Sequence, residues 1–204
     1  MRRAFDLSKH EPIAEGTANW VFEHPDDPSL LIKVVRPDVI PHRWGTKSRW
    51  YKRLNRARQN AGFIRELQEY CVLRAHHPHD ELPVERPVAL VDTNFGLGLV
   101  VEAVRDSDGN LARTILNVVK EAGFTPSVRE KLDEFRDELL RFDTVIREMN
   151  AGNLVIDEKR DRIVLIDGIG ENAAIPVNYY SRRLRHRTIN RRFDRMIESL
   201  QRAS

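Results

Sequence analysis

The spacing of apolar positions changes along the chain and divides it into a strand-rich first half and a helix-rich second half. Short apolar runs at residues 20–22 and 30–35 flank a segment rich in Pro and Asp, which predicts a β-hairpin. Two further runs, residues 88–92 and 97–104, are joined by a turn at residues 93–96 and predict a second pair of strands. We therefore expect a small antiparallel sheet.

One helix is predicted between these two pairs of strands. Phe63, Leu67, Tyr70 and Leu73 recur at helical spacing. Glu66 shares the face that Phe63, Tyr70 and Leu73 define, so this helix carries an acid toward the core.

Helical periodicity dominates the second half. A helix is expected at about residues 111–121, closed by Gly123, and another is expected to begin at Ser127 as its N-cap. Apolar residues at alternating steps of four and three predict a buried stripe on that second helix. The stripe consists of Val128, Leu132, Phe135, Leu139 and Phe142. A last helix with a rough apolar face is expected at residues 182–200.

The composition fits one domain of two lobes, an N-lobe at about residues 1–104 and a C-lobe at about 105–204. The 204 residues are 41% hydrophobic and 32% charged, enough to bury a core. No run approaches the roughly 18 apolar residues of a spanning helix, and the start of the chain lacks the apolar stretch of a signal peptide. We therefore expect no transmembrane segment and a cytoplasmic location. Cys71 is the only cysteine, and its apolar helical context predicts a buried thiol.

Positive charge is concentrated in two blocks, although the formal net charge is only +3. The first block lies between residues 41 and 60 and is interleaved with Trp44, Trp50 and Tyr51. The second runs from Arg182 to Arg195. Each block could be a solvated helix face, or could bind a nucleic-acid backbone or an anionic lipid surface.

Lys33 lies inside the apolar run at residues 31–35, and a buried lysine needs an anionic partner. Glu66 is the natural candidate, unless Lys33 faces solvent from an edge strand. Ahead of Lys33, residues 14–21 occupy the register of a G-x-G-x-x-G-x-V phosphate-binding loop. Only Gly16 of the three glycines is present, so an ordinary turn is the alternative.

A second cluster of polar residues is predicted at the ends of two short strands. Residues 147–156, a charged turn and residues 163–168 match the order and spacing of a kinase catalytic loop and metal-binding turn. Mg²⁺ is commonly held by a carboxylate and phosphate oxygens, and Asp167 with the Asn153 side-chain carbonyl offers such ligands. The alternative is a hairpin in which this Asn and Asp cap turns. We favour the metal site.

Taken together and in order, these motifs give the chain a family resemblance. The further stretches that carry it are Arg65-Glu66-Leu67 with Tyr70, residues 92–98 with Val104, Asp108-Gly109, and residues 167–172. The chain resembles the PhoP-regulatory-network YrbL family, a small group similar to protein kinases, over nearly its whole length. The resemblance implies a minimal bilobed kinase-like fold of the α+β class, with ATP and Mg²⁺ as cofactors and a hinge from Glu102 to Val104 whose backbone would bind adenine.

The sequence also departs from the kinase pattern. Glu148 stands where a kinase has the Asp that receives the proton of the substrate hydroxyl. Its extra methylene moves the carboxylate by about 1 Å, and a misplacement of that size can cost about 100-fold in rate. About 35 residues follow Asp167-Gly168, so we expect little platform on which a peptide substrate could dock. Two hypotheses result: a phosphotransferase with a small or lipid-like acceptor, or a non-catalytic regulatory module that contacts a protein, nucleic acid or anionic surface through its arginines.

Overall fold

The computed structural model describes residues 4–40, 58–171 and 177–203. The chain divides into two compact units, one made of Met1–Ile64 and Arg86–Ala103 and the other of Arg65–Glu85 and Val104–Ser204. The segment Arg65–Glu85, which the predicted N-lobe includes, is thus grouped with the second unit. Most of the first basic block, with its tryptophans and tyrosine, lies outside the described residues.

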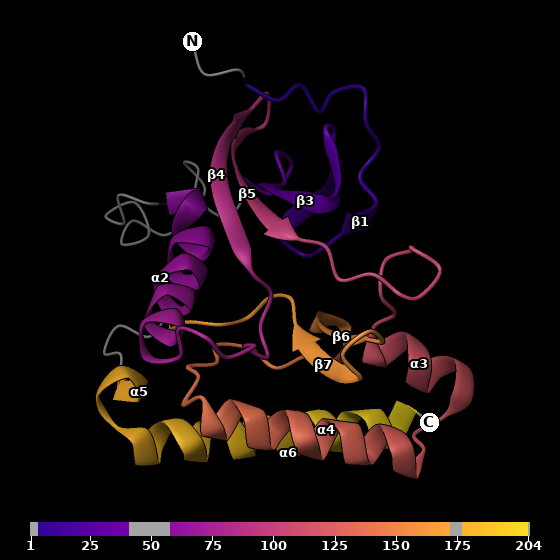
Figure 1. Ribbon diagram of the computed structural model, residues 1–204, viewed down its shortest axis with the longest axis vertical. Coiled ribbons are helices and arrows are strands. Elements are labelled where there is room, and N and C mark those ends of the chain that lie inside the picture. The colour runs from indigo at the N-terminus through magenta and orange to yellow at the C-terminus, as the bar shows by residue number, and fades with distance from the viewer. Residues whose placement is uncertain (1–3, 41–57, 172–176, 204) are drawn as a thin grey trace. The chain divides into compact units, whose positions relative to one another are not determined.

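An antiparallel sheet with the strand order β1-β2-β3-β5-β4 forms the first unit (Figure 1). Its strands are β1 (Ala14–Glu15), β2 (Asn19–His24), β3 (Asp27–Val35), β4 (Pro87–Thr93) and β5 (Gly96–Glu102). Both predicted hairpins are confirmed, although β3 begins at Asp27 and leaves a shorter turn than the Pro- and Asp-rich segment predicts. Strand β3 lies in the middle of the sheet, between β2 and β5.

The core of the first unit is small and partly aromatic. Phe22, Ile32 and Val100 are 1%, 0% and 2% exposed and belong to one apolar cluster. Phe95 stacks on Phe22 with ring centroids 5.9 Å apart, and Trp20 meets Phe95 edge-on at 5.6 Å. Such aromatic pairs add about 1 kcal/mol each to the burial of their area.

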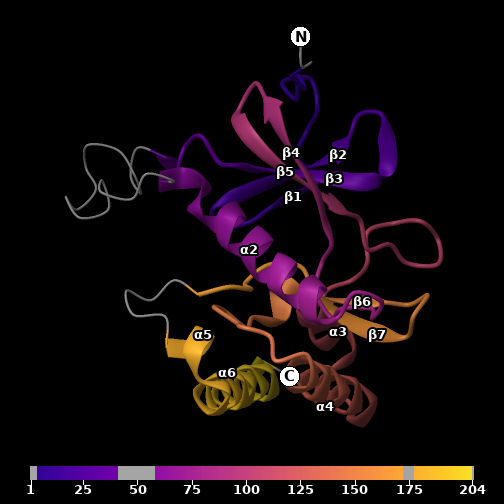
Figure 2. The ribbon, with the colours of Figure 1, turned by 60° about the vertical axis from the view of Figure 1, so that its left-hand side comes forward.

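Helices and one hairpin form the second unit, to which all but the first residues of α2 belong (Figure 2). Its elements are α2 (Ala61–His76), α3 (Ile115–Ala122), α4 (Pro126–Arg141), η3 (Ala151–Asn153), β6 (Leu154–Asp157), β7 (Arg162–Leu165), α5 (Val177–Tyr180) and α6 (Arg182–Ala203). The short helix η2 (Arg58–Asn60) precedes α2 and belongs to the first unit. The sheet and these helices confirm the predicted α+β class. No helix within the described ranges has the length and apolarity needed to cross a membrane.

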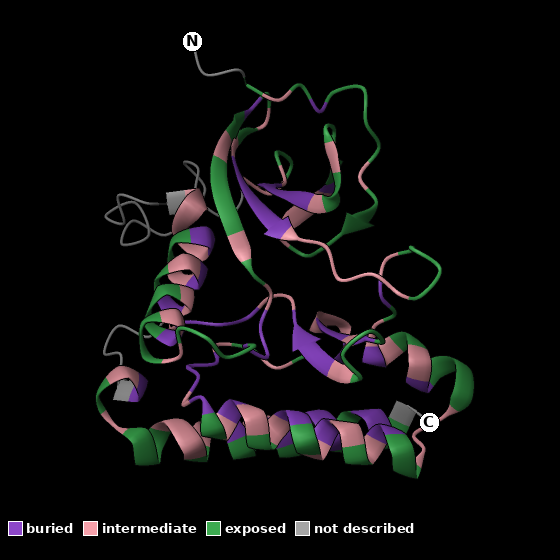
Figure 3. Cartoon of the chain, in the orientation of Figure 1, coloured by how far each residue is buried: buried purple, intermediate pink, exposed green. Residues whose placement is uncertain are grey.

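Helices α4 and α6 pack side by side and supply much of the second core (Figures 2 and 3). Every residue of the predicted α4 stripe is buried, from Val128 at 8% exposed to Phe142 at 3%. Helix α6 contributes Ile189, Phe193 and Met196 to the same cluster. Burying side chains of this size stabilises the fold by about 2 kcal/mol each.

Two helix starts differ from the predictions. Helix α3 begins at Ile115, because Thr114 caps it and Leu111 instead forms an isolated bridge with Arg105. Helix α4 is capped by Thr125, not by Ser127. The Thr125 hydroxyl accepts a hydrogen bond from the third amide of the helix, and the proline that follows is favoured at a first helical position because its fixed φ suits the helix.

The prediction of a buried thiol is wrong, because Cys71 is exposed. Helix α2 buries the face of Phe63 and Leu73, each 2% exposed. Cys71 follows Tyr70 by about 100° around the helix and joins the outer side, where Ile64 and Val72 are 45% and 46% exposed. An apolar neighbourhood in sequence was therefore not a buried one in space.

Candidate functional site

The β6–β7 hairpin brings the two predicted metal ligands to the same place in the second unit. Leu154 pairs with Leu165, so the residues just outside this pair lie at one end of the hairpin. The Ile166 amide donates a hydrogen bond to the Asn153 carbonyl oxygen at 2.9 Å. Asp167 is the next residue. Residues 153 and 167 therefore lie at the same end of the hairpin, beside this backbone hydrogen bond.

The loop that carries Glu148 is hydrogen-bonded to the segment that follows Asp167. The backbone amides of Arg147 and Glu148 both donate to the Gly168 carbonyl oxygen, at 2.7 and 3.1 Å. The Gly168 φ of +106° is one that L side chains rarely adopt, and an added Cβ would lie 2.4 Å from the Glu148 carbonyl oxygen. The glycine after Asp167 therefore makes the close approach of these two segments possible.

Arg147 forms an ion pair with Asp167, with 3.0 Å between a guanidinium nitrogen and Oδ1. Burial lowers the pKa of the nearby Arg65 guanidinium and the charge of Arg147 lowers it further, while the carboxylates of Glu66 and Asp167 oppose these effects. Asp167 thus lies among cations. Nothing in the sequence around Arg147 indicates this pairing.

The ligand set suits a magnesium–phosphate complex better than a metal held by protein alone. No cluster of three or more His, Cys, Asp or Glu side chains that could hold a metal exists within the described residues. Asp167 would supply one carboxylate and Asn153 one amide oxygen. Mg²⁺ keeps several waters and is usually bound through one or two carboxylates and substrate phosphates, so the two residues fit that ion.

Lys33 is buried, with 6% of its surface exposed, on the central strand β3. It pairs in register with Val21 on β2 and with Leu99 on β5. The alternative of a solvent-facing lysine on an edge strand is therefore wrong. Glu66 is also buried, at 9% exposed, but belongs to the other unit, so its role in orienting Lys33 stays a prediction.

The segment around Gly16 links β1 to β2 as a tight turn. The Gly16 amide donates to the Asn19 carbonyl oxygen at 2.8 Å. Arg36, just after β3, donates a side-chain hydrogen bond to the Gly16 carbonyl oxygen at 3.2 Å, and its backbone amide donates to Ala18 at 2.9 Å. The turn is thus tied to the end of the strand that carries Lys33. Whether it contacts phosphate stays a prediction.

The predicted hinge from Glu102 to Val104 has several backbone groups already paired. The Ala103 amide donates to the Ser29 carbonyl oxygen at 2.8 Å, and the Val104 carbonyl oxygen accepts from the Ala112 amide at 2.9 Å. The Glu102 carboxylate forms an ion pair with Arg86 at 2.8 Å. Adenine would have to use the remaining backbone groups of this segment.

Glu69 is a buried acid that sequence reasoning missed. It is 1% exposed, and its Oε1 accepts a hydrogen bond from the Val145 amide at 2.7 Å, at the start of the loop that leads to Glu148. Burial raises the pKa of Glu69 to about 7; the Val145 hydrogen bond and Arg185 act against this, and Asp143 adds to it. Its position three residues after Glu66, on the same helical face, was the available signal.

The second basic block divides into inward and outward arginines. Arg185 donates to Asp143 at 2.9 Å through Nε, and His186 contacts the same carboxylate at 3.1 Å. Arg192 donates to the Ile146 carbonyl oxygen. Part of the block therefore stabilises the fold around the Glu148 loop and is not a free cationic surface.

Comparisons with known proteins place the chain in a family. No curated protein matches it. A crystal structure of Rad53 residues 1–466 in complex with AMP-PNP is similar, with 14% identity and a TM-score of 0.48 over 78% of this chain; the chain covers 36% of that one. The family model described as PhoP regulatory network protein YrbL matches residues 5–201. Because that match takes in almost the whole sequence, the chain belongs to the YrbL family.

Proposed function

We propose that the chain is a kinase-like protein that binds ATP with Mg²⁺ and transfers the γ-phosphoryl group to a small or lipid-like acceptor. The observation that carries the proposal is the arrangement of Asn153, Asp167 and the Glu148 loop around paired backbone. One carboxylate, one amide oxygen and one further acid beside them are the protein groups that phosphoryl transfer uses.

Residues of both units have roles in the proposal. Lys33 contacts the α- and β-phosphates and Glu66 orients it. The turn at Gly16 covers the phosphates, and backbone groups between Glu102 and Val104 bind adenine. Bound Mg²⁺ would supply positive charge against the phosphate oxygens, held by the two residues at the end of the β6–β7 hairpin.

In the transfer step, the acceptor hydroxyl oxygen forms a bond to the γ-phosphorus. The bond from that phosphorus to the bridging oxygen breaks, and its electron pair leaves with ADP. Glu148 receives the hydroxyl proton, a step for which a positioned side chain contributes about 10²- to 10⁴-fold in rate. A Glu148→Gln variant should therefore lose turnover by about that factor while it still binds ATP.

Thermal unfolding with and without ATP and Mg²⁺ tests nucleotide binding. A ligand at about 100 times its dissociation constant adds about 2.7 kcal/mol, which raises the midpoint of a chain of this size by roughly 5–10 °C. Lys33→Ala and Asp167→Ala should each abolish the rise. Asp161→Asn is the matched control, because Asp161 is an exposed acid at a left-handed position (φ 48°) that Asn tolerates.

The outcomes separate the parts of the proposal. A rise in wild type and in Asp161→Asn that both other variants lose supports the nucleotide site. A rise that survives in Asp167→Ala would refute the metal role of this residue. No rise at millimolar ATP and Mg²⁺ would refute nucleotide binding altogether.

The ion pair between Arg147 and Asp167 favours a second candidate, a non-catalytic regulatory module. To bind a metal ion, the Asp167 carboxylate would have to break its ion pair with the Arg147 guanidinium, which weakens metal binding. The outward arginines Arg187 and Arg191 would then contact an anionic partner, and their reversal to Glu should weaken binding to single-stranded nucleic acid in a salt-dependent manner. Unchanged binding would count against this candidate.

A further inference from the structure

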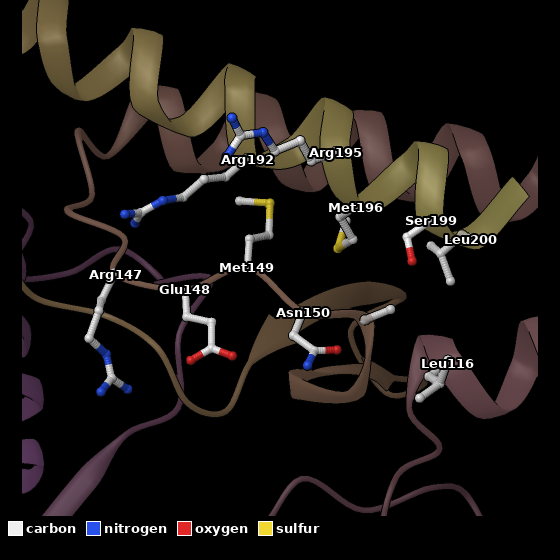
Figure 4. A pocket seen from close by; sticks show the side chains of 11 residues that line it. Leu116, Arg147, Glu148, Met149, Asn150, Arg192, Arg195, Met196, Ser199 and Leu200 are labelled. Atoms are coloured by element: carbon white, nitrogen blue, oxygen red, sulfur yellow. The ribbon is translucent and has the colours of Figure 1, made fainter. Parts of the chain in front are cut away.

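A cavity of about 420 Å³ lies in the second unit beside Glu148 (Figure 4). This volume is within the range of small-molecule sites, about 300–1,000 Å³. The loop at residues 147–151 forms one wall and helix α6 another, and Leu116 of α3 contributes at one end. Glu148, the proposed proton acceptor, lines this cavity, but the proposal above names no ligand for its other walls.

The chemistry of the cavity differs between its two ends. Arg147, Glu148 and Arg192 lie toward one end, whereas Leu116, Ser199 and Leu200 lie at the other (Figure 4). Met149 and Met196 lie between them. Methionine side chains adapt their shape, so this middle part suits an alkyl chain better than a rigid group. The cavity therefore presents charge at the Glu148 end and a mainly apolar surface, with the Ser199 hydroxyl, at the other.

Positive charge dominates the polar part of the lining. Arg147 points away from helix α6 (Figure 4) and is paired with Asp167. Arg192 is partly buried and donates one hydrogen bond to the Ile146 carbonyl oxygen, and its guanidinium, which stays charged in proteins, has further N–H donors for a ligand. Arg195 is exposed, and the structure records no ion pair for it among the described residues. Arg192 and Arg195, about one turn apart on α6, thus both line the cavity, and guanidinium binds phosphate or carboxylate in a bidentate manner.

We propose that this cavity binds an amphiphilic anion, a phosphate or carboxylate group attached to a single alkyl chain. Arg192 and Arg195 bind the anionic group, and the methionine and leucine side chains bind the alkyl chain. A hydroxyl group of the ligand would then lie at the Glu148 end, as the phosphate acceptor. This acceptor role rests on the proposed function, whereas the binding itself needs no nucleotide.

Isothermal titration calorimetry with n-octyl phosphate, without nucleotide and below the concentration at which it forms micelles, tests the binding. Inorganic phosphate tests whether the anion alone is bound, and n-octyl glucoside tests whether the alkyl chain alone is enough. The variants are Arg195→Glu, which reverses one charge of the lining, and Ser199→Trp, which fills the apolar end. Matched controls on the same helix are Arg191→Glu and Gln201→Trp, whose exposed parent residues lie outside the lining.

We expect n-octyl phosphate to bind at least about tenfold more tightly than either control ligand. Arg195→Glu and Ser199→Trp should each weaken it by about tenfold or more, and the two control variants should leave it unchanged. No binding, equal binding of inorganic phosphate, or equal loss in Arg191→Glu would each overturn the proposal. If octyl phosphate binds as expected but ATP fails to stabilise the protein, the cavity is a ligand site and the proposed phosphotransfer is wrong.

Discussion

Replacing Glu69 with Gln should change the pH dependence of stability in a direction that the structure fixes. Burial raises the pKa of this carboxyl from 4.5 to about 7 in the folded protein, where the side chain is 1% exposed. The folded state therefore holds the Glu69 proton over a pH range in which the unfolded chain has released it. Stability from this group is fully present below about pH 4.5 and is lost as the pH rises through about 7.

The size of the effect follows from the two pKa values. One pKa unit corresponds to about 1.4 kcal/mol. Glu69 therefore lowers the free energy of unfolding by about 3 kcal/mol above neutral pH, relative to acidic pH. Gln cannot ionise, but its carbonyl oxygen can still accept the hydrogen bond from the Val145 amide. The variant should thus resemble wild type at about pH 5 and exceed it by about 2–3 kcal/mol at about pH 8.

Chemical unfolding followed by far-ultraviolet circular dichroism at several pH values measures this difference. Glu130→Gln is the control, because Glu130 is an exposed acid on α4 and its replacement should leave the difference from wild type constant with pH. A Glu69→Gln variant whose stability relative to wild type is the same at about pH 5 and about pH 8 would refute the reasoning. So would a variant that is less stable than wild type at the higher pH.

Three further predictions follow from single contacts. Gly168→Ala should lower the free energy of unfolding by about 3 kcal/mol in a denaturant titration, because its φ is +106° and the Cβ would lie 2.4 Å from the Glu148 carbonyl oxygen. Thr125→Ala should lower it by about 1 kcal/mol, since the side chain caps α4; equal midpoints would contradict this. On the proposed function, Arg147→Ala should reduce the Mg²⁺ concentration needed for half-maximal stabilisation by ATP, because it removes the ion pair with Asp167, and an increase would show that Arg147 supports the proposed site.

Features that depend on local periodicity could be predicted from the sequence. The α4 stripe from Val128 to Phe142 is correct because helical spacing alone determines which side chains share a face. The sequence predicts the cap at Ser127, but two hydroxyl residues lie within three positions, and the proline between them favours Thr125 as the residue before the helix. The apolar neighbours of Cys71 predict a place in the core, although it lies on the outer side of α2.

Contacts between distant residues could not be predicted in the same way. Arg147 and Asp167 are 20 positions apart, and Glu69 and Val145 are 76 apart. Such pairs depend on how the helices and loops pack together, and no local sequence pattern indicates this packing. The Asn153 and Asp167 positions are an intermediate case, because a short hairpin between them makes their proximity a consequence of strand pairing.

Because the Gly168 carbonyl oxygen accepts from two successive amides, backbone hydrogen bonds join the loop before β6 to the segment after β7. These two hydrogen bonds involve backbone atoms alone. The local backbone geometry should therefore persist when the side chain of Glu148, Asp167 or Arg147 is changed, provided that residue 168 remains glycine. In this chain, then, the shape of the proposed site depends on the backbone, and exchanging the side chains that it carries should change its chemistry without refolding.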